Sequence, residues 1–90
     1  MGRFVGIHTV PGFSREMLQG ATERLGRLCD ARFVRAYSSF GAGKVVCDWE
    51  AADKEAVTRT YVALGLPYDE ILAVEAICER GPGGVDTEYL

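Results

Sequence analysis

Histidine and cysteine are scarce in this 90-residue chain, which contains one histidine, His8, and three cysteines. Cys29, Cys47 and Cys78 form no Cys-x-x-Cys pair, so the sequence shows no local zinc site. A small secreted domain usually carries an even set of cysteines joined in disulfides. The odd number therefore favours a reducing compartment, and we expect a cytoplasmic protein.

An excess of positive charge and a long hydrophobic run are also missing. Ten basic and thirteen acidic residues leave a net charge of −3, which argues against nucleic acid or an anionic membrane as a partner. No run approaches the roughly 18–20 consecutive apolar residues that a membrane helix needs. With 48% hydrophobic and 26% charged residues, the composition is that of an ordinary globular domain.

Four segments have the composition of β-strands. Runs rich in β-branched and aromatic residues cover 3–10, 32–40, 44–50 and 70–78. The second and third runs flank the short loop Gly41-Ala42-Gly43, which is typical of an antiparallel hairpin.

Two helices are predicted between these strands. Ser14 and Asp53 are good N-cap residues, and the second helix is expected to end at Gly65. The apolar positions recur at helical spacing and form the predicted helix core: Leu18, Ala21, Leu25, Leu28, Ala56, Val57, Tyr61 and Leu64.

The resulting order, βαββαβ, predicts an α+β fold of the ferredoxin-like type. It is a four-stranded antiparallel sheet with two helices on one face, and the strands at 3–10 and 44–50 lie at its centre. Residues 1–78 form the predicted domain. Residues 79–90, which are acidic and rich in Gly and Pro, are expected to form a flexible tail.

The face of the sheet that no helix covers should carry the function. Strand side chains alternate between faces, and we assign the smoother aliphatic sets, such as Val5 and Ile7, to the helix side. The open face then receives Phe4, His8, Phe33, Arg35, Tyr37, Val45, Cys47, Trp49, Glu75 and Ile77. So large an apolar patch predicts a homodimer that pairs two open faces and encloses a cavity.

The register of the strand at 44–50 decides part of this assignment. It places Val46 and Asp48 on the helix side, which would bury a carboxylate near the core. In the reverse register, Cys47 and Trp49 are core residues instead.

The open-face set predicts cofactor-free acid/base chemistry on a small molecule, such as an isomerisation or a cyclisation. His8 would act as the base because the imidazole pKa suits proton transfer near neutral pH, while Arg35, Tyr37 and Glu75 polarise the substrate. Phe4, Phe33, Cys47 and Trp49 would line the ligand site. The alternatives are structural: His8 paired across the dimer, Cys47 as a packing residue, and Arg35–Glu75 as an ion pair at the rim.

The sequence also resembles a known family. The matching stretches are Phe4-Val5 through His8 and Pro11, then Val46-Cys47, then Glu50 through Val57, then Gly65-Leu66-Pro67 with Asp69-Glu70-Ile71. Together they are similar to a family of small ferredoxin-like domains of largely unknown function that includes a nickel-binding protein, related to dimeric α/β-barrel proteins.

The resemblance implies a homodimer and a transition-metal site, with Ni²⁺ held by His8 and Cys47. It also implies that metal-binding relatives carry further histidines, at positions corresponding to Thr22, Tyr61 and Leu64 here. A dimerisation module without chemistry is a third hypothesis.

Overall fold

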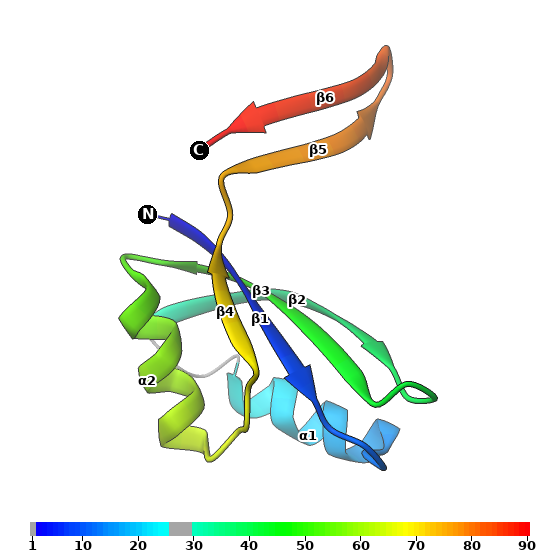
Figure 1. The fold of residues 1–90 in the computed structure, drawn as a ribbon, viewed down its shortest axis with the longest axis vertical. Coiled ribbons are helices and arrows are strands. Elements are labelled where there is room, and N and C mark those ends of the chain that lie inside the picture. The colour runs from blue at the N-terminus through cyan, green and yellow to red at the C-terminus, as the bar shows by residue number, and fades with distance from the viewer. Residues whose placement is uncertain (1, 26–29) are drawn as a thin grey trace.

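The computed structural model describes residues 2–25 and 30–90 (Figure 1). Leu28 and Cys29, which entered the sequence analysis, lie outside the described residues. The elements in chain order are β1 (Gly2–Thr9), α1 (Arg15–Leu25), β2 (Ala31–Ser39), β3 (Lys44–Ala51), α2 (Lys54–Leu64), β4 (Glu70–Ala73), β5 (Ala76–Gly81) and β6 (Gly84–Tyr89). Neither of these helices has the length and apolar character needed to cross a membrane.

The first four strands form one antiparallel sheet in the order β2-β3-β1-β4. The predicted α+β class and the central positions of β1 and β3 are therefore confirmed. Both helices lie on the same side of this sheet in Figure 1, whereas the β5–β6 hairpin stands on the other side.

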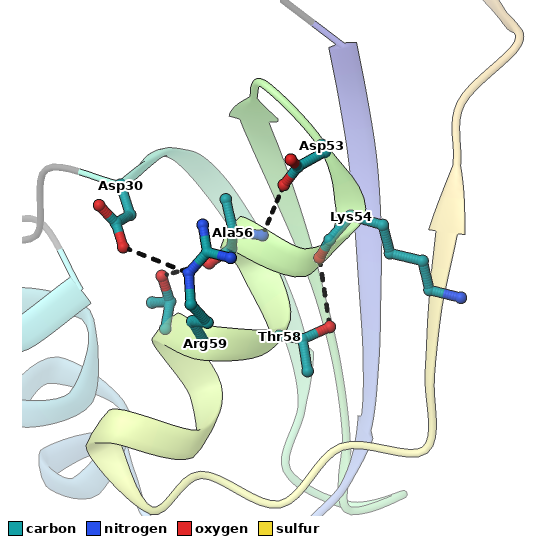
Figure 2. Close-up of polar contacts among 7 residues, drawn as sticks. Asp30, Asp53, Lys54, Ala56, Thr58 and Arg59 are labelled. Carbon is teal, nitrogen blue, oxygen red and sulfur yellow. Dashed lines mark hydrogen bonds and ion pairs between the residues drawn. The ribbon is translucent and has the colours of Figure 1, made fainter.

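Both helices begin, and α2 ends, at the residues that the sequence indicates. Ser14 Oγ accepts a hydrogen bond from the backbone N–H of Met17 at 3.2 Å, which caps α1. Asp53 Oδ1 accepts one from Ala56 N–H at 2.9 Å and caps α2 (Figure 2). Gly65 closes α2 in the left-handed conformation, at φ 66°.

Two further contacts hold α2 in the fold (Figure 2). Arg59 lies 3.6 Å from Asp30, the first described residue after α1. Thr58 donates a hydrogen bond to the Lys54 carbonyl at 3.2 Å. The helix is thus capped at both ends and joined to the segment before β2.

The helices cover the opposite face of β1 and β3 from the one predicted. Phe4, His8, Val45, Cys47 and Trp49 are buried on the helix side. The prediction that they share the open face is therefore wrong, and the reverse register of β3 is confirmed.

The alternation of β3 explains this outcome. Its buried positions are Val45, Cys47, Trp49 and Ala51, whereas the intervening positions include the charged Lys44, Asp48 and Glu50. Residues directly opposite each other on paired strands share a face of the sheet. Phe4 pairs with Trp49 and His8 pairs with Val45, so Phe4 and His8 of β1 also face the helices. In β4, Ile71 is buried and Leu72 is 47% exposed.

A β-bulge divides the predicted open-face residues of β2. The pairing with β3 shifts between Phe33 and Arg35, and the extra residue reverses the alternation. Phe33 therefore packs on the Trp49 ring, with ring centroids 5.5 Å apart, while Arg35 pairs with Asp48 on the open face at 3.7 Å. The prediction that Phe33 lies on the same face as Arg35 is wrong.

The C-terminal region differs from the predicted strand at 70–78 and tail at 79–90. Strand β4 ends at Ala73, and the Val74 N–H donates to the Arg3 carbonyl at 2.9 Å, where the chain leaves the sheet. Residues 76–89 then form an antiparallel hairpin. The glycines that suggested a tail form its turn, where Gly84 has φ 126°.

Gly6 is expected to be intolerant of a side chain. A Cβ at this position would collide with Tyr61 Oη and approach the Tyr61 ring to 2.9–3.0 Å. We expect Gly6→Ala to lower the free energy of unfolding by about 1–3 kcal/mol or more, measured by chemical denaturation.

The control is Gly20→Ala, at a helical position where a Cβ meets no atom within 4 Å. This change should raise stability by about 0.5–1 kcal/mol. Equal effects of the two substitutions would contradict the close fit of Tyr61 on Gly6.

Candidate functional site

A cavity of about 340 Å³ lies between α1 and the sheet, within the size range of small-molecule sites. Helix α1, the segment after β1 and the segment after α2 form its walls, and β1, β2 and β3 form its floor. Its lining is mostly apolar and consists of His8, Val10, Pro11, Phe13, Met17, Leu18, Ala21, Thr22, Leu25, Ala36, Val45, Cys47, Tyr61, Leu66 and Pro67.

Helix α1 covers the cavity without filling it. Leu25 is the buried residue of its described length, and Leu18 and Ala21 from the predicted apolar stripe line the cavity half-buried. Met17 at the edge is 62% exposed. The apolar face of α1 therefore points at the sheet, as predicted, but leaves room for a ligand beneath it.

His8 is the polar group whose position is best defined in this cavity. Its side chain is buried, with 6% of its surface exposed. Its Nδ1 lies 2.6 Å from the Pro67 carbonyl oxygen. Because a carbonyl can only accept a hydrogen bond, Nδ1 carries a proton, and Nε2 of the neutral ring presents a lone pair.

The Nε2 atom of His8 has no hydrogen-bond partner in the described part of the chain. Buried polar side chains normally have partners, and an exception calls for an explanation. His8 itself lines the cavity, so a bound molecule is a natural partner for this lone pair.

A buried chain of polar groups lies beside His8. The Trp49 indole N–H donates to Tyr61 Oη at 2.6 Å, and the Tyr61 hydroxyl and the Cys47 thiol are near enough for each to shift the pKa of the other. The His8 and Tyr61 rings meet edge to face, with centroids 4.7 Å apart. Tyr61 therefore holds three of the predicted site residues in one cluster.

Burial strongly affects the proton equilibria of this cluster. Desolvation raises the pKa of Cys47 to about 11, although the Tyr61 hydroxyl opposes this shift. Desolvation, together with the nearby Cys47, also raises the pKa of Tyr61. Both groups are neutral near pH 7, so Cys47 is a thiol there and not a thiolate.

The remaining predicted site residues lie elsewhere. Arg35 and Tyr37 are exposed on the opposite face of the sheet, and Glu75 is exposed between β4 and β5. The structure thus brings His8 and Cys47 together on the cavity wall but separates them from Arg35, Tyr37 and Glu75. Phe4, Phe33 and Trp49 pack within or against the core outside the cavity lining.

Sequence reasoning missed the roles of Tyr61 and Pro67. A tyrosine within the apolar stripe of a helix was an available signal, because a buried hydroxyl needs a partner. The Pro67 carbonyl gives no signal in the sequence, since any residue there supplies the same backbone group.

Fold and site define a small α+β domain with an apolar cavity and one histidine directed into it. The chain belongs to the family described as nickel responsive protein SCO4226-like, whose model matches residues 4–74. The family expected from the resemblance is therefore confirmed.

Among solved structures, the chain is similar to SCO4226 from Streptomyces coelicolor A3(2). The two are 25% identical with a TM-score of 0.74, and the match covers 80% of this chain and 94% of that chain. No curated protein matches the chain. The β5–β6 hairpin lies beyond the residues that the family model matches.

The raised pKa of Cys47 predicts a loss of stability at alkaline pH. An unfolded thiol with a pKa near 9 ionises before the folded one with a pKa of about 11, so stability is intact below pH 9 and falls as the pH rises toward 11. Between pH 8 and pH 10 we expect Cys47 to account for about 1 kcal/mol of this loss. Denaturation of wild type and Cys47→Ala across this range measures it.

Cys78 provides the matched control, because it is exposed. Cys78→Ala should retain the pH dependence of the wild type, whereas Cys47→Ala should show a smaller one. An unchanged pH dependence in Cys47→Ala would show that burial does not hold the proton on Cys47.

Proposed function

We propose that this ferredoxin-like domain binds a small, largely apolar molecule in the cavity beneath α1, and that His8 Nε2 accepts a hydrogen bond from it. The observation that carries the proposal is that His8 lines a cavity of about 340 Å³ and that its buried Nε2 has no partner in the described part of the chain. A small-molecule ligand is thus proposed as in the sequence analysis, but at a different place. The sequence analysis places it between the sheets of two chains, whereas the cavity beneath α1 lies within one chain.

The lining indicates the chemical class of the ligand. Phe13, Leu18, Val45 and Leu66 offer apolar contacts to its body. With its proton on Nδ1, the His8 ring in its neutral form can accept a hydrogen bond from an O–H or N–H group at Nε2. A phenol, an alcohol or an amide therefore matches this set of groups better than a carboxylate, which brings no donor.

A more specific version of this proposal is that His8 takes a proton from the bound molecule. His8 is the group in the cavity that can take a proton from a bound molecule, since Cys47 and Tyr61 are held neutral by burial. An isomerase or cyclase would have to operate without Arg35, Tyr37 and Glu75, because these lie outside the cavity lining. The geometry thus supports binding more directly than catalysis.

A pair of probes that differ by one hydroxyl tests the role of His8. We expect 2-naphthol to bind about two- to tenfold more tightly than naphthalene, as one hydrogen bond contributes about 0.5–1.5 kcal/mol. Titration followed by two-dimensional NMR measures both affinities, and the shifted resonances should come from α1 and from the cavity floor.

His8→Phe should bind the two probes equally, because it retains an aromatic ring and loses the acceptor. Tyr37→Phe removes a hydroxyl on the opposite face, where the side chain is 61% exposed, and should bind as the wild type does. A preference for 2-naphthol that survives in His8→Phe would refute the assignment of Nε2.

Nickel is the second candidate ligand, and the family description favours it. The hydrogen bond from His8 Nδ1 to the Pro67 carbonyl is one that metal-ligating histidines usually make, because they donate the N–H of the other ring nitrogen to an acceptor. The described residues, however, include no group of three or more His, Cys, Asp or Glu that could hold a metal ion. Thr22 and Tyr61, where the resemblance implies histidines in relatives, line this cavity without a nitrogen ligand.

The residues present therefore do not make a complete nickel site. Within the cavity lining, His8 and Cys47 offer a nitrogen and a thiol donor, and Met17 adds a thioether, a soft ligand that suits Cu(I). With a pKa of about 11, the Cys47 thiol would have to release its proton to bind a metal. We derive no chemistry through nickel.

Isothermal titration with Ni²⁺ separates the two candidates. We expect no stoichiometric binding that depends on both His8 and Cys47. Uptake of one Ni²⁺ per chain, lost in His8→Ala and in Cys47→Ala but retained in Cys78→Ala, would place nickel in the cavity and displace the organic ligand as the leading candidate.

A further inference from the structure

Thr22 is the second polar side chain of the cavity whose hydrogen bonds define what it can offer a ligand. It is half-buried on α1 and lines the cavity from the helix, whereas His8 lines it from β1. Its Oγ1 lies 3.0 Å from the Leu18 carbonyl oxygen and 3.0 Å from the Gln19 carbonyl oxygen. The hydroxyl is therefore bonded to the preceding turn of its own helix, as helical threonines often are.

These two contacts fix the role of the Thr22 hydroxyl toward a bound molecule. A hydroxyl has one proton and two lone pairs, and a carbonyl oxygen can only accept a hydrogen bond. The proton is thus directed at the Leu18 and Gln19 carbonyls, and the lone pairs of Oγ1 remain. Thr22 offers a ligand an acceptor, as His8 Nε2 does.

The other polar groups of the lining supply neither a strong donor nor a charge. Tyr61 Oη accepts the Trp49 N–H at 2.6 Å and lies against the Gly6 backbone, so it is engaged in the core. The Cys47 thiol is a weak donor that burial keeps protonated near pH 7. Among the described residues of the lining, none is Asp, Glu, Lys or Arg.

We propose that the cavity takes a neutral molecule with two hydrogen-bond donors on an apolar body, one donated to His8 Nε2 and the other to Thr22 Oγ1. The inference rests on the proposed function, because it concerns the same cavity, and it names the class of ligand: an aliphatic diol or a dihydroxylated aromatic compound. A charged ligand would lose its hydration without a counter-ion in the lining, which is costly.

Thr22 is thus a specificity-determining residue. A ligand with a single donor gives it to His8 Nε2, which is buried and has no partner in the described part of the chain. Thr22 Oγ1 already has two partners in its own helix. Its lone pairs therefore distinguish a ligand with two donors from a ligand with one.

Three isomers of dihydroxynaphthalene test the second donor. 2,3-Dihydroxynaphthalene, 2,6-dihydroxynaphthalene and 2,7-dihydroxynaphthalene each add one hydroxyl to 2-naphthol, at different positions on the same rings. We expect at least one of them to bind the full chain about two- to tenfold more tightly than 2-naphthol, because of the added hydrogen bond. Titration followed by two-dimensional NMR measures each affinity.

Thr22→Val removes the hydroxyl and keeps the shape of the side chain. It should bind the favoured isomer no more tightly than 2-naphthol. Its affinity for 2-naphthol should equal that of the wild type, which also shows that the cavity is intact. Thr22→Ser retains Oγ1 and should retain the preference for the isomer.

Thr58→Val is the matched control. Thr58 is half-buried on α2, and its hydroxyl donates to the Lys54 carbonyl, four residues before it, at 3.2 Å. It lies outside the cavity lining. The same substitution should therefore leave the affinities for all probes as they are in the wild type.

The outcomes separate this inference from the proposed function. If neither naphthalene nor 2-naphthol binds, the proposed function fails, and the role of Thr22 fails with it. If 2-naphthol binds with a preference that depends on His8, but no isomer binds more tightly, only the role of Thr22 is refuted. A gain that survives in Thr22→Val refutes it as well.

Discussion

The arrangement of the molecule depends on the fit of Tyr61 against Gly6. The Tyr61 ring has no exposed surface, and its hydroxyl lies where a Cβ at position 6 would be. At this point the hydroxyl accepts a hydrogen bond from the Trp49 N–H and lies near enough to Cys47 to affect the pKa of its thiol. One helical side chain thus joins α2 to both central strands, and it determines which faces of β1 and β3 turn inward.

This fit also explains which parts of the structure the sequence could predict. The order of the elements from β1 to α2, the caps at Ser14 and Asp53 and the end of α2 at Gly65 follow from local patterns, since neighbouring residues determine them. The β5–β6 hairpin does not, because the sequence there predicts the end of a strand and a tail. The face of a strand is a tertiary property. The side chains on one face of β1, which include Val5 and Ile7, are the more aliphatic. The other face, which includes Gly6 and His8, is the one that turns toward the helices, because Gly6 leaves room for Tyr61. The alternation of charged and apolar residues in β3 is a better indicator of the buried face than the aliphatic residues of β1. Residues of β1 that pair with apolar positions of β3 face the helices with them.

For the same reason the candidate site could be predicted only in part. His8 and Cys47 were selected for their chemistry, and they do meet at one cavity. Simple alternation along β2 predicts that Arg35 and Tyr37 lie on the same face as Phe33. The bulge after Phe33 adds one residue, so Arg35 and Tyr37 lie on the opposite face. Two of the three positions singled out by the resemblance, Thr22 and Tyr61, line the same cavity as His8, whereas Leu64 lies outside its lining.

The two faces of the sheet differ in what lies against them. The cavity lies on the helix side and is covered by α1, whose described residues include one buried side chain, Leu25. A ligand there would complete the packing of α1 and stabilise the fold in proportion to its affinity and concentration. The hairpin and the open face lie on the other side, with Tyr37 and Leu72 exposed. Because the open face lies on the side of the sheet away from the cavity, a ligand beneath α1 makes no contact with it, and changes to exposed open-face residues leave the packing of α1 unaffected.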